Sequence, residues 1–115
     1  MKLVPVCGLS SWINVYRLYK KTFPFYERKS FSIIKSMNKK EAADIWIISN
    51  NNSFAGFAIT LNHKDLILLD YFAISPNMRG NGLGGKALKE LQKIYSDKRL
   101  FLEIETTFSD SKNKN

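Results

Sequence analysis

The stretch "RGNGLGGK", residues 79–86, contains four glycines within eight positions. Glycine allows a backbone to approach a ligand closely but costs conformational entropy, so such a run ahead of a helix indicates a function. The spacing fits three patterns of phosphate sites: G-x-G-x-x-G, G-x-x-x-x-G-K and R-x-x-G-x-G. Backbone N–H groups at the start of a helix attract negative charge, which is the physical basis of such sites. The stretch therefore predicts an anion site, and a glycine-rich turn without a ligand is the alternative.

The second pattern, the loop of nucleotide triphosphatases, lacks one residue that its chemistry requires. The lysine of that loop is followed by Ser or Thr, whose hydroxyl binds Mg²⁺. Here Ala87 follows Lys86, and no second acidic strand supplies the other metal ligand. We therefore expect neither a triphosphatase nor a metal site.

The first pattern, the dinucleotide fingerprint, is a stronger alternative. A strand precedes the glycines, a helix follows, and Glu103 and Glu105 lie at about the 20-residue separation that the fingerprint requires. However, residues 75–79 separate the strand from the first glycine, where the fingerprint needs a tight turn directly after the strand. The preceding strands also have the pattern of hairpins, whereas a dinucleotide fold repeats parallel units. These two differences make a dinucleotide site the weaker hypothesis.

The N-terminal part has the pattern of two helices followed by three strands. Residues 10–21 carry apolar side chains at helical spacing and end before Pro24, and residues 27–37 have a second apolar face. The next apolar segments are short and rich in β-branched and aromatic residues, as strands are. They span residues 44–49, 54–61 and 66–74. Because short polar turns separate these segments, we expect an antiparallel meander. Residues ahead of the first helix are expected to form a strand or a loop.

After the glycines, the apolar period becomes that of a helix. Residues 82–95 place apolar side chains on one stripe, with three lysines and a glutamate outside it. Residues 99–105 have the pattern of another strand, and a crossover helix between two strands implies parallel pairing. The sequence therefore predicts a mixed α+β fold with two helices, a three-stranded meander, the glycine loop, a helix and one parallel strand.

Length and composition indicate one globular domain, over residues 1–105, with a flexible tail at 106–115. The net charge of +8 attracts a polyanionic ligand. The 18 lysines and arginines are scattered along the chain, so nucleic-acid binding is the weaker alternative. No apolar run has the length of a membrane helix. The single cysteine, Cys7, expected in the core, excludes an internal disulfide and fits the reducing cytoplasm.

The segment "LLDYFAISPNMRGNGLGGKALKEL", residues 68–91, resembles the acyl-CoA-binding core of the GNAT superfamily of N-acyltransferases. In that family a strand leads to a loop R/Q-x-x-G-x-G/A, which opens a helix and binds the pyrophosphate of the cofactor through backbone N–H groups. The resemblance extends to the two opening helices and the hairpins, so it covers the chain up to Glu105. It includes "FPFYERKS", residues 23–30, a segment common between the first two helices of bacterial members.

The resemblance implies transfer of an acetyl group from acetyl-CoA to a primary amine. It also implies which residues contact the co-substrate. The backbone of Phe72, Ala73 and Ile74 is expected to meet the pantetheine arm like an added strand. The pyrophosphate is expected to lie among Arg79, Gly80, Asn81, Gly82, Leu83, Gly84, Gly85 and Lys86.

A protonated amine cannot attack an acyl group, so an acceptor for its proton is needed. Family members commonly place a carboxylate on the strand before the glycine loop, and that strand here offers Asp70. A structural hydrogen bond at the strand edge is the alternative role of Asp70. Glu105 is a second candidate, with Glu103 beside it on the same predicted face. Outer-face solvation is the alternative for both glutamates, and His63 is expected to be a solvated turn residue.

The family normally continues past this point with another helix and two more strands, and a tyrosine there often protonates the departing thiolate. This sequence ends ten residues after Glu105, so we expect a C-terminally shortened member. The edge of strand 99–105 would then be unpaired, which favours a homodimer or higher oligomer through that edge. The alternatives to an active enzyme are an inactive acyl-CoA-binding or oligomerisation module and a basic nucleic-acid-binding protein.

Overall fold

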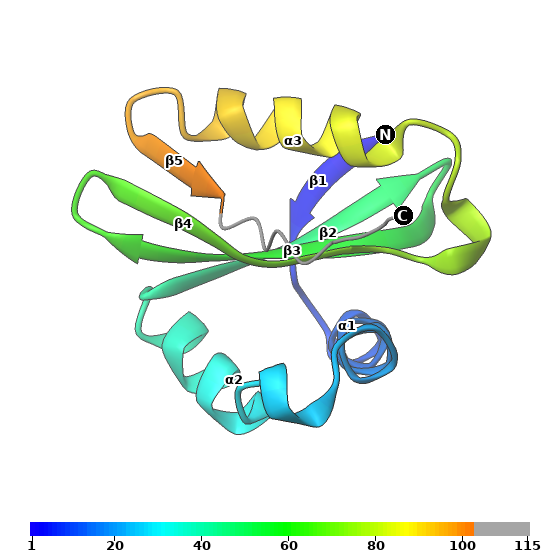
Figure 1. The fold of residues 1–115 in the computed structure, drawn as a ribbon, viewed down its shortest axis with the longest axis horizontal. Helices are drawn as coiled ribbons and strands as arrows, with labels where there is room; N and C mark the ends of the chain where they lie inside the picture. Colours follow the sequence, from blue (N-terminus) through cyan, green and yellow to red (C-terminus); the bar gives the residue numbers. More distant parts are fainter. Residues whose placement is uncertain (103–115) are drawn as a thin grey trace, which may run out of the picture.

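The chain forms a five-stranded sheet with helices on both faces (Figure 1). The computed structural model describes residues 1–102, and α1 and α2 lie on one face of the sheet while α3 lies on the other. No helix among these residues is long and apolar enough to cross a membrane. In chain order the elements are β1 (Lys2–Pro5), α1 (Leu9–Thr22), the 3₁₀ turn η1 (Phe25–Glu27), α2 (Phe31–Lys39), β2 (Ala43–Asn50), β3 (Ser53–His63), β4 (Leu66–Ile74), the 3₁₀ turn η2 (Pro76–Met78), α3 (Leu83–Ile94) and β5 (Arg99–Leu102).

The predicted meander and the parallel last strand are confirmed. β2, β3 and β4 pair antiparallel, and β5 runs parallel to β4 after the crossover by α3. The β2–β3 turn places Asn51 and Asn52 at φ values of 53° and 64°, a left-handed conformation that asparagine tolerates. The residues ahead of α1 form β1, which pairs with β2. Residues 103–105 of the predicted last strand and the predicted tail at 106–115 lie outside the described residues, so association through that strand stays a prediction.

The predicted helix over residues 27–37 was wrong at its start. Phe25–Glu27 form a 3₁₀ turn, and α2 begins only at Phe31. The backbone between them is extended, and its polar groups bond the hydroxyls of Tyr19 from α1 and Tyr71 from β4. Hydrogen bonds to distant elements thus replace the helical ones that the local apolar period predicted.

The core has two halves, one on each face of the sheet. Phe57 and Ile59 of β3 pack on the side of α1 and α2. Ala58, between them, packs with Leu91 of α3 on the opposite side. Because successive strand residues point to opposite faces, a central strand between two helical layers is buried on both sides. Accordingly, residues 55–60 of β3 are all buried.

A buried hydroxyl ties the end of α3 to the sheet. Tyr95 is 7% exposed, and its Oη donates to Asp44 Oδ2 at 2.5 Å and accepts from Trp46 Nε1 at 3.0 Å. Thr60 Oγ1 lies 2.8 Å from the same oxygen. Burial, and then the hydrogen bond with Asp44, raises the pKa of Tyr95 to about 12. The network stabilises the neutral tyrosine.

Replacing Tyr95 with phenylalanine is expected to lower the free energy of unfolding by about 1–3 kcal/mol, because Asp44 and Trp46 lose a buried partner. The wild-type chain should also lose stability at alkaline pH. The pKa of a tyrosine is about 10 in the unfolded chain, and that of Tyr95 in the folded chain is about 12. The stabilisation from the protonated hydroxyl of Tyr95 is therefore complete below about pH 10 and is lost as the pH rises to about 12. Tyr95→Phe should lose less stability over this pH interval than the wild type. Tyr19, whose pKa is also raised by burial, contributes an alkaline loss of stability in both proteins.

Urea denaturation at about pH 9 and about pH 11.5 measures both effects, since these values bracket the ionisation of an ordinary tyrosine. Tyr26→Phe is the matched control, because Tyr26 is largely exposed. Equal alkaline losses in the wild type and in Tyr95→Phe would contradict the assignment.

Candidate functional site

The glycine turn leads from the end of β4 into α3. After Ile74 the chain forms η2, and Gly80 and Gly82 then take φ values of 86° and 71°. This left-handed region is costly for residues with a Cβ atom, which explains glycine at these two positions. Gly82 is the residue ahead of the first helical turn of α3, and no side chain caps that turn.

The backbone amides of this turn have no hydrogen-bond acceptor in the part of the chain that the structure describes. Within residues 1–102, none of the six amides from Gly80 to Gly85 donates a hydrogen bond to a carbonyl or a side chain, and helical bonding starts with Lys86 N and Gly82 O at 3.2 Å. A Cβ atom added at Gly80, Gly82 or Gly85 would meet no protein atom within 4 Å. The turn is therefore open at these three positions, and its N–H groups lie without a protein partner from residues 1–102 at the positive end of a helix.

The side chains around the turn have other roles. Arg79 Nε donates to Ile74 O at 2.9 Å, and Asn81 Nδ2 donates to Met78 O at 3.3 Å. Leu83 is buried in the core under α3. Lys86 lines a hollow beside Met1 and Asn50, away from the turn itself, together with Lys89, Glu90 and Lys93. The open side of the turn is thus formed by main chain.

The strand that leads to the turn is free on one side over its second half. β5 pairs with Leu66–Leu69 of β4, and residues 70–74 have no partner on that side within the described chain. Phe72 and Ile74 pack toward α3, whereas Ala73 is buried on the face of α1 and α2. Phe72–Ile74 are the last residues of β4, and the glycine turn follows them after η2.

β4 contains a bulge at Asp70. Ile59 of β3 pairs with Tyr71, and the next residue, Thr60, pairs with Leu69, so Asp70 is the extra residue. The insertion reverses the alternation of the strand: Leu69 packs on the face of α3, and Tyr71 packs on the face of α1 and α2. As a result, the consecutive side chains of Asp70 and Tyr71 both reach the segment between α1 and α2.

That segment is held by tyrosines and by an ion pair. Tyr71 Oη donates to Glu27 O at 2.7 Å and accepts from Lys29 N at 3.1 Å, and Tyr19 Oη donates to Lys29 O at 2.9 Å. Burial raises the pKa of Tyr19, so its hydroxyl stays protonated beyond the pH at which an ordinary tyrosine ionises. Lys29 Nζ lies 2.6 Å from Asp70 Oδ2, and the two side chains are 37% and 18% exposed. The other carboxylate oxygen, Oδ1, has no hydrogen-bond partner among the described residues.

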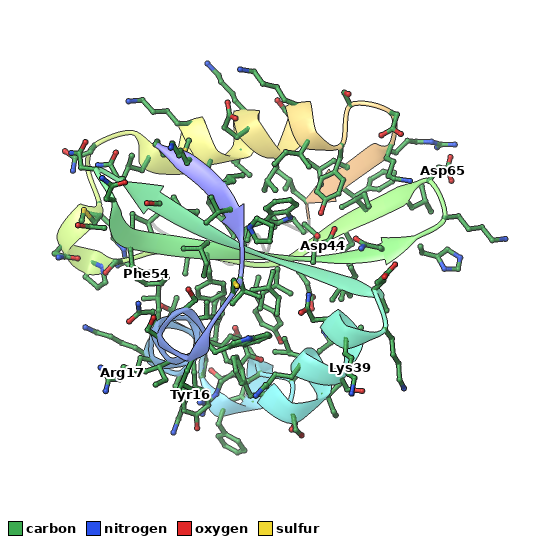
Figure 2. All side chains as sticks on the ribbon, turned by 180° about the vertical axis from the view of Figure 1, so that it is seen from behind. Tyr16, Arg17, Lys39, Asp44, Phe54 and Asp65 are labelled. Carbon is green, nitrogen blue, oxygen red and sulfur yellow. The ribbon has the colours of Figure 1, made fainter. Side chains whose placement is uncertain are left out.

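A cavity of about 400 Å³ is lined by residues of α1, of α2 and of the segment between them, including Lys29 of this ion pair. We call it the α1–α2 cavity. Lys29 is one of its lining residues, so the cavity lies next to the bulge that carries Asp70. Tyr16 of α1, another lining residue, lies in the same helical layer (Figure 2). Its lining residues are Tyr16, Tyr19, Lys20, Phe25, Arg28, Lys29, Ser30, Phe31 and Ser32.

The structure brings some predicted site residues together and leaves others apart. The glycine turn adjoins the end of β4, and Asp70 lies on the same strand, at the bulge. Glu103 and Glu105 lie outside the described residues. Cys7, predicted to be in the core, is exposed, and the expected exposure of His63 is confirmed.

Sequence reasoning missed Lys29 and Tyr71 as residues of this site. Tyr71 was part of a strand pattern, and nothing local distinguishes a bulge from regular alternation. Lys29 lies in the segment 23–30, and the resemblance of that segment to one common in the family is the signal that could have indicated it.

Comparisons with known proteins identify the family of the chain. The family model described as "Acetyltransferase (GNAT) family" matches residues 12–113. A curated protein of Bacillus subtilis (strain 168), "Putative acetyltransferase YjbC", is 30% identical over 98 residues, which cover 85% of this chain and 48% of that protein. The chain thus spans about half the length of this relative.

Two solved structures share the fold. A GNAT-family protein from Bacteroides thetaiotaomicron superposes with a TM-score of 0.82 at 20% identity, covering 93% of this chain and 62% of that one. A GNAT family acetyltransferase from Elizabethkingia anophelis, with acetyl-CoA bound, gives a TM-score of 0.62 at 17% identity, covering 88% of this chain and 63% of that one. Together with the family model, which spans most of the sequence, these likenesses show that the chain belongs to the GNAT acetyltransferase family.

Proposed function

We propose that the protein is an N-acetyltransferase that moves the acetyl group of acetyl-CoA to a primary amine. The observation that carries the proposal is the row of six unused amides from Gly80 to Gly85 at the start of α3. A diphosphate accepts several hydrogen bonds and carries the negative charge that a helix N-terminus favours. The family membership and a relative solved with acetyl-CoA bound support this choice of anion.

In this proposal the main chain of the turn binds the diphosphate, and glycine is needed at positions 80 and 82 because their positive φ values are costly for other residues. The guanidinium of Arg79 keeps the turn close to the end of β4 through its bond to Ile74 O. The main chain of Phe72–Ile74, which has no partner on the side of β5 among residues 1–102, accommodates the pantetheine arm by strand-like hydrogen bonding. Lys86, directed toward Met1 and Asn50, adds long-range positive charge rather than a contact.

Asp70 is the proposed acceptor of the amine proton. When bound, acetyl-CoA supplies an activated acetyl thioester, so the remaining requirement is a neutral amine. The bulge places Asp70 against Lys29, a residue that lines the α1–α2 cavity, and Oδ1 has no hydrogen-bond partner among residues 1–102, so it is available to accept a proton directly or through water. Lys29 holds the carboxylate in place through Oδ2. Glu105 stays a second candidate for the same role.

The proposal predicts both binding and turnover. Coenzyme A at about 100 times its Kd should raise the free energy of unfolding by about 2.7 kcal/mol, because it binds the native state only. Thermal unfolding measures this as a higher Tm, with pantetheine, which lacks the diphosphate, as the control. Release of free thiol from acetyl-CoA in the presence of a panel of primary amines measures turnover.

The two measurements also separate the proposal from its alternative. A higher Tm without thiol release with any amine would support an inactive acyl-CoA-binding module. An unchanged Tm together with no thiol release would contradict both.

A further inference from the structure

The charges around the α1–α2 cavity bear on the class of amine that the protein takes. Three cationic side chains, Lys20, Arg28 and Lys29, line the cavity, and no carboxylate of residues 1–102 is among its lining residues. Since this cavity adjoins the proposed proton acceptor, Asp70, it is the place where an acceptor amine would enter. The inference below therefore rests on the proposed function.

Only one of the three cations is neutralised. Lys29 pairs with Asp70, and the other ion pair among residues 1–102 is Lys93–Glu90 on α3. Lys20 and Arg28 thus have no carboxylate partner in the described part of the chain. The ammonium of Lys20 lies over the ring of Tyr16, 5.1 Å from its centroid, which directs it along the cavity wall. The cavity keeps an excess of positive charge.

Such a cavity discriminates among amines by charge. A ligand that carries several positive charges would be repelled by these cations, and added salt would weaken the repulsion because Lys20 is solvent-exposed. A carboxylate or phosphate would be attracted, and the planar guanidinium of Arg28 can bind either with two parallel hydrogen bonds. The hydroxyls of Ser30 and Ser32, 2.8 Å apart at the start of α2, add donors on the same wall. The volume of about 400 Å³ is that of a small-molecule site.

The two ends of the site have opposite chemistry. Arg28 and Lys20 supply positive charge in the cavity, and Asp70 supplies a carboxylate beyond Lys29. We propose that the acceptor is a small amine that also carries an anionic group, a carboxylate or a phosphate, which binds at Arg28 and Lys20 while the amine is directed to Asp70. Amino acids and phosphorylated amino alcohols are two sources of this chemistry.

Matched pairs of amines test the proposal by calorimetry and by thiol release. The probes are O-phosphoethanolamine with ethanolamine, and leucine with leucinamide, because each pair differs mainly in the anionic group. We expect the member with the anionic group to bind at least tenfold more tightly than the member that lacks it, and to show the higher kcat/KM. Added salt should weaken that preference. Comparison of the two pairs shows whether phosphate or carboxylate is favoured.

Arg28→Gln should reduce the affinity for the anionic member at least tenfold, mainly through KM in the thiol assay. Arg17→Gln is the matched control: it also removes one positive charge, from an exposed position of α1 next to Tyr16 and outside the lining of the cavity (Figure 2). Arg28→Lys, which keeps the charge but loses the planar fork, should give an intermediate loss.

Failure of this inference differs from failure of the proposed function. Thiol release with neutral or polycationic amines, without a preference for anionic ones, would overturn the inference and leave the acetyltransferase intact. Absence of calorimetric binding by every anionic amine would overturn it whatever the thiol assay shows. Equal effects of Arg28→Gln and Arg17→Gln would do the same.

Discussion

Replacing Gly85 with glutamate is expected to make the protein more stable and to abolish its binding of coenzyme A. Gly85 is the third residue of α3, and a Cβ atom there would meet no protein atom within 4 Å. A glutamate at the third helical position can reach back to the amide of the residue ahead of the helix, here Gly82. The new carboxylate would therefore occupy the amides that we assign to the diphosphate, and it would repel a second anion.

The two expected effects have opposite signs, which makes Gly85→Glu informative. Loss of a helical glycine contributes about 0.5–1 kcal/mol, and a negative charge in the first turn contributes about 0.3–1 kcal/mol. The free energy of unfolding should thus rise by about 1 kcal/mol or more, while the affinity for coenzyme A falls at least a hundredfold. Denaturant unfolding and calorimetry measure the two quantities.

Two controls separate the charge from other effects of Gly85→Glu. Gly85→Ala gains helix propensity without the carboxylate, so its stability should rise and its affinity should fall much less. Gln92→Glu adds the same charge at the other end of α3, at an exposed position, and should leave the affinity unchanged. If Gly85→Glu bound coenzyme A as tightly as the wild type, the glycine turn would not be part of the binding site.

Replacing Asp70 with asparagine is expected to lower kcat by about 10²–10⁴-fold, which is the usual contribution of a positioned general base. Binding of coenzyme A should not change, because the glycine turn is separate from the bulge. The stability should fall by no more than about 1 kcal/mol, since the ion pair with Lys29 is partly solvated. Steady-state thiol release, calorimetry and urea denaturation provide the three readouts.

Glu90→Gln is the matched control for Asp70→Asn. It changes a carboxylate to an amide and removes the other described ion pair, with Lys93, on the exposed face of α3. Its kcat should equal that of the wild type. If Asp70→Asn kept a wild-type kcat, Asp70 would be a structural partner of Lys29, and Glu105 would become the candidate to test next.

The elements that the sequence predicted well are those set by local rules. Asparagines with positive φ mark the β2–β3 turn, and the change of apolar period at the glycines marks the start of α3. The glycine turn could be predicted for the same reason, since two of its glycines take backbone conformations that other residues avoid.

The features that could not be predicted depend on contacts between distant segments. Residues 27–30 have a helical pattern, but hydroxyls from Tyr19 and Tyr71 bond their backbone in an extended form. Likewise, residues 66–74 form an almost unbroken apolar run in which nothing marks a bulge, and only the pairing of β4 with β3 reveals that Asp70 is an extra residue. The ion pair with Lys29, and with it the position of the cavity, follows from those two tertiary features.

The central claim is that the amides of the glycine turn bind the diphosphate of coenzyme A, and nuclear magnetic resonance of protein labelled with ¹⁵N-glycine tests it most directly. The chain has six glycines, so the spectrum contains few signals. Titration with coenzyme A should shift the signals of Gly80, Gly82, Gly84 and Gly85 until saturation, while the signal of Gly8, at the start of α1, stays in place and pantetheine alone has little effect. If saturating coenzyme A left those four signals unmoved, or shifted the signal of Gly8 by as much, the assignment of the site would be contradicted.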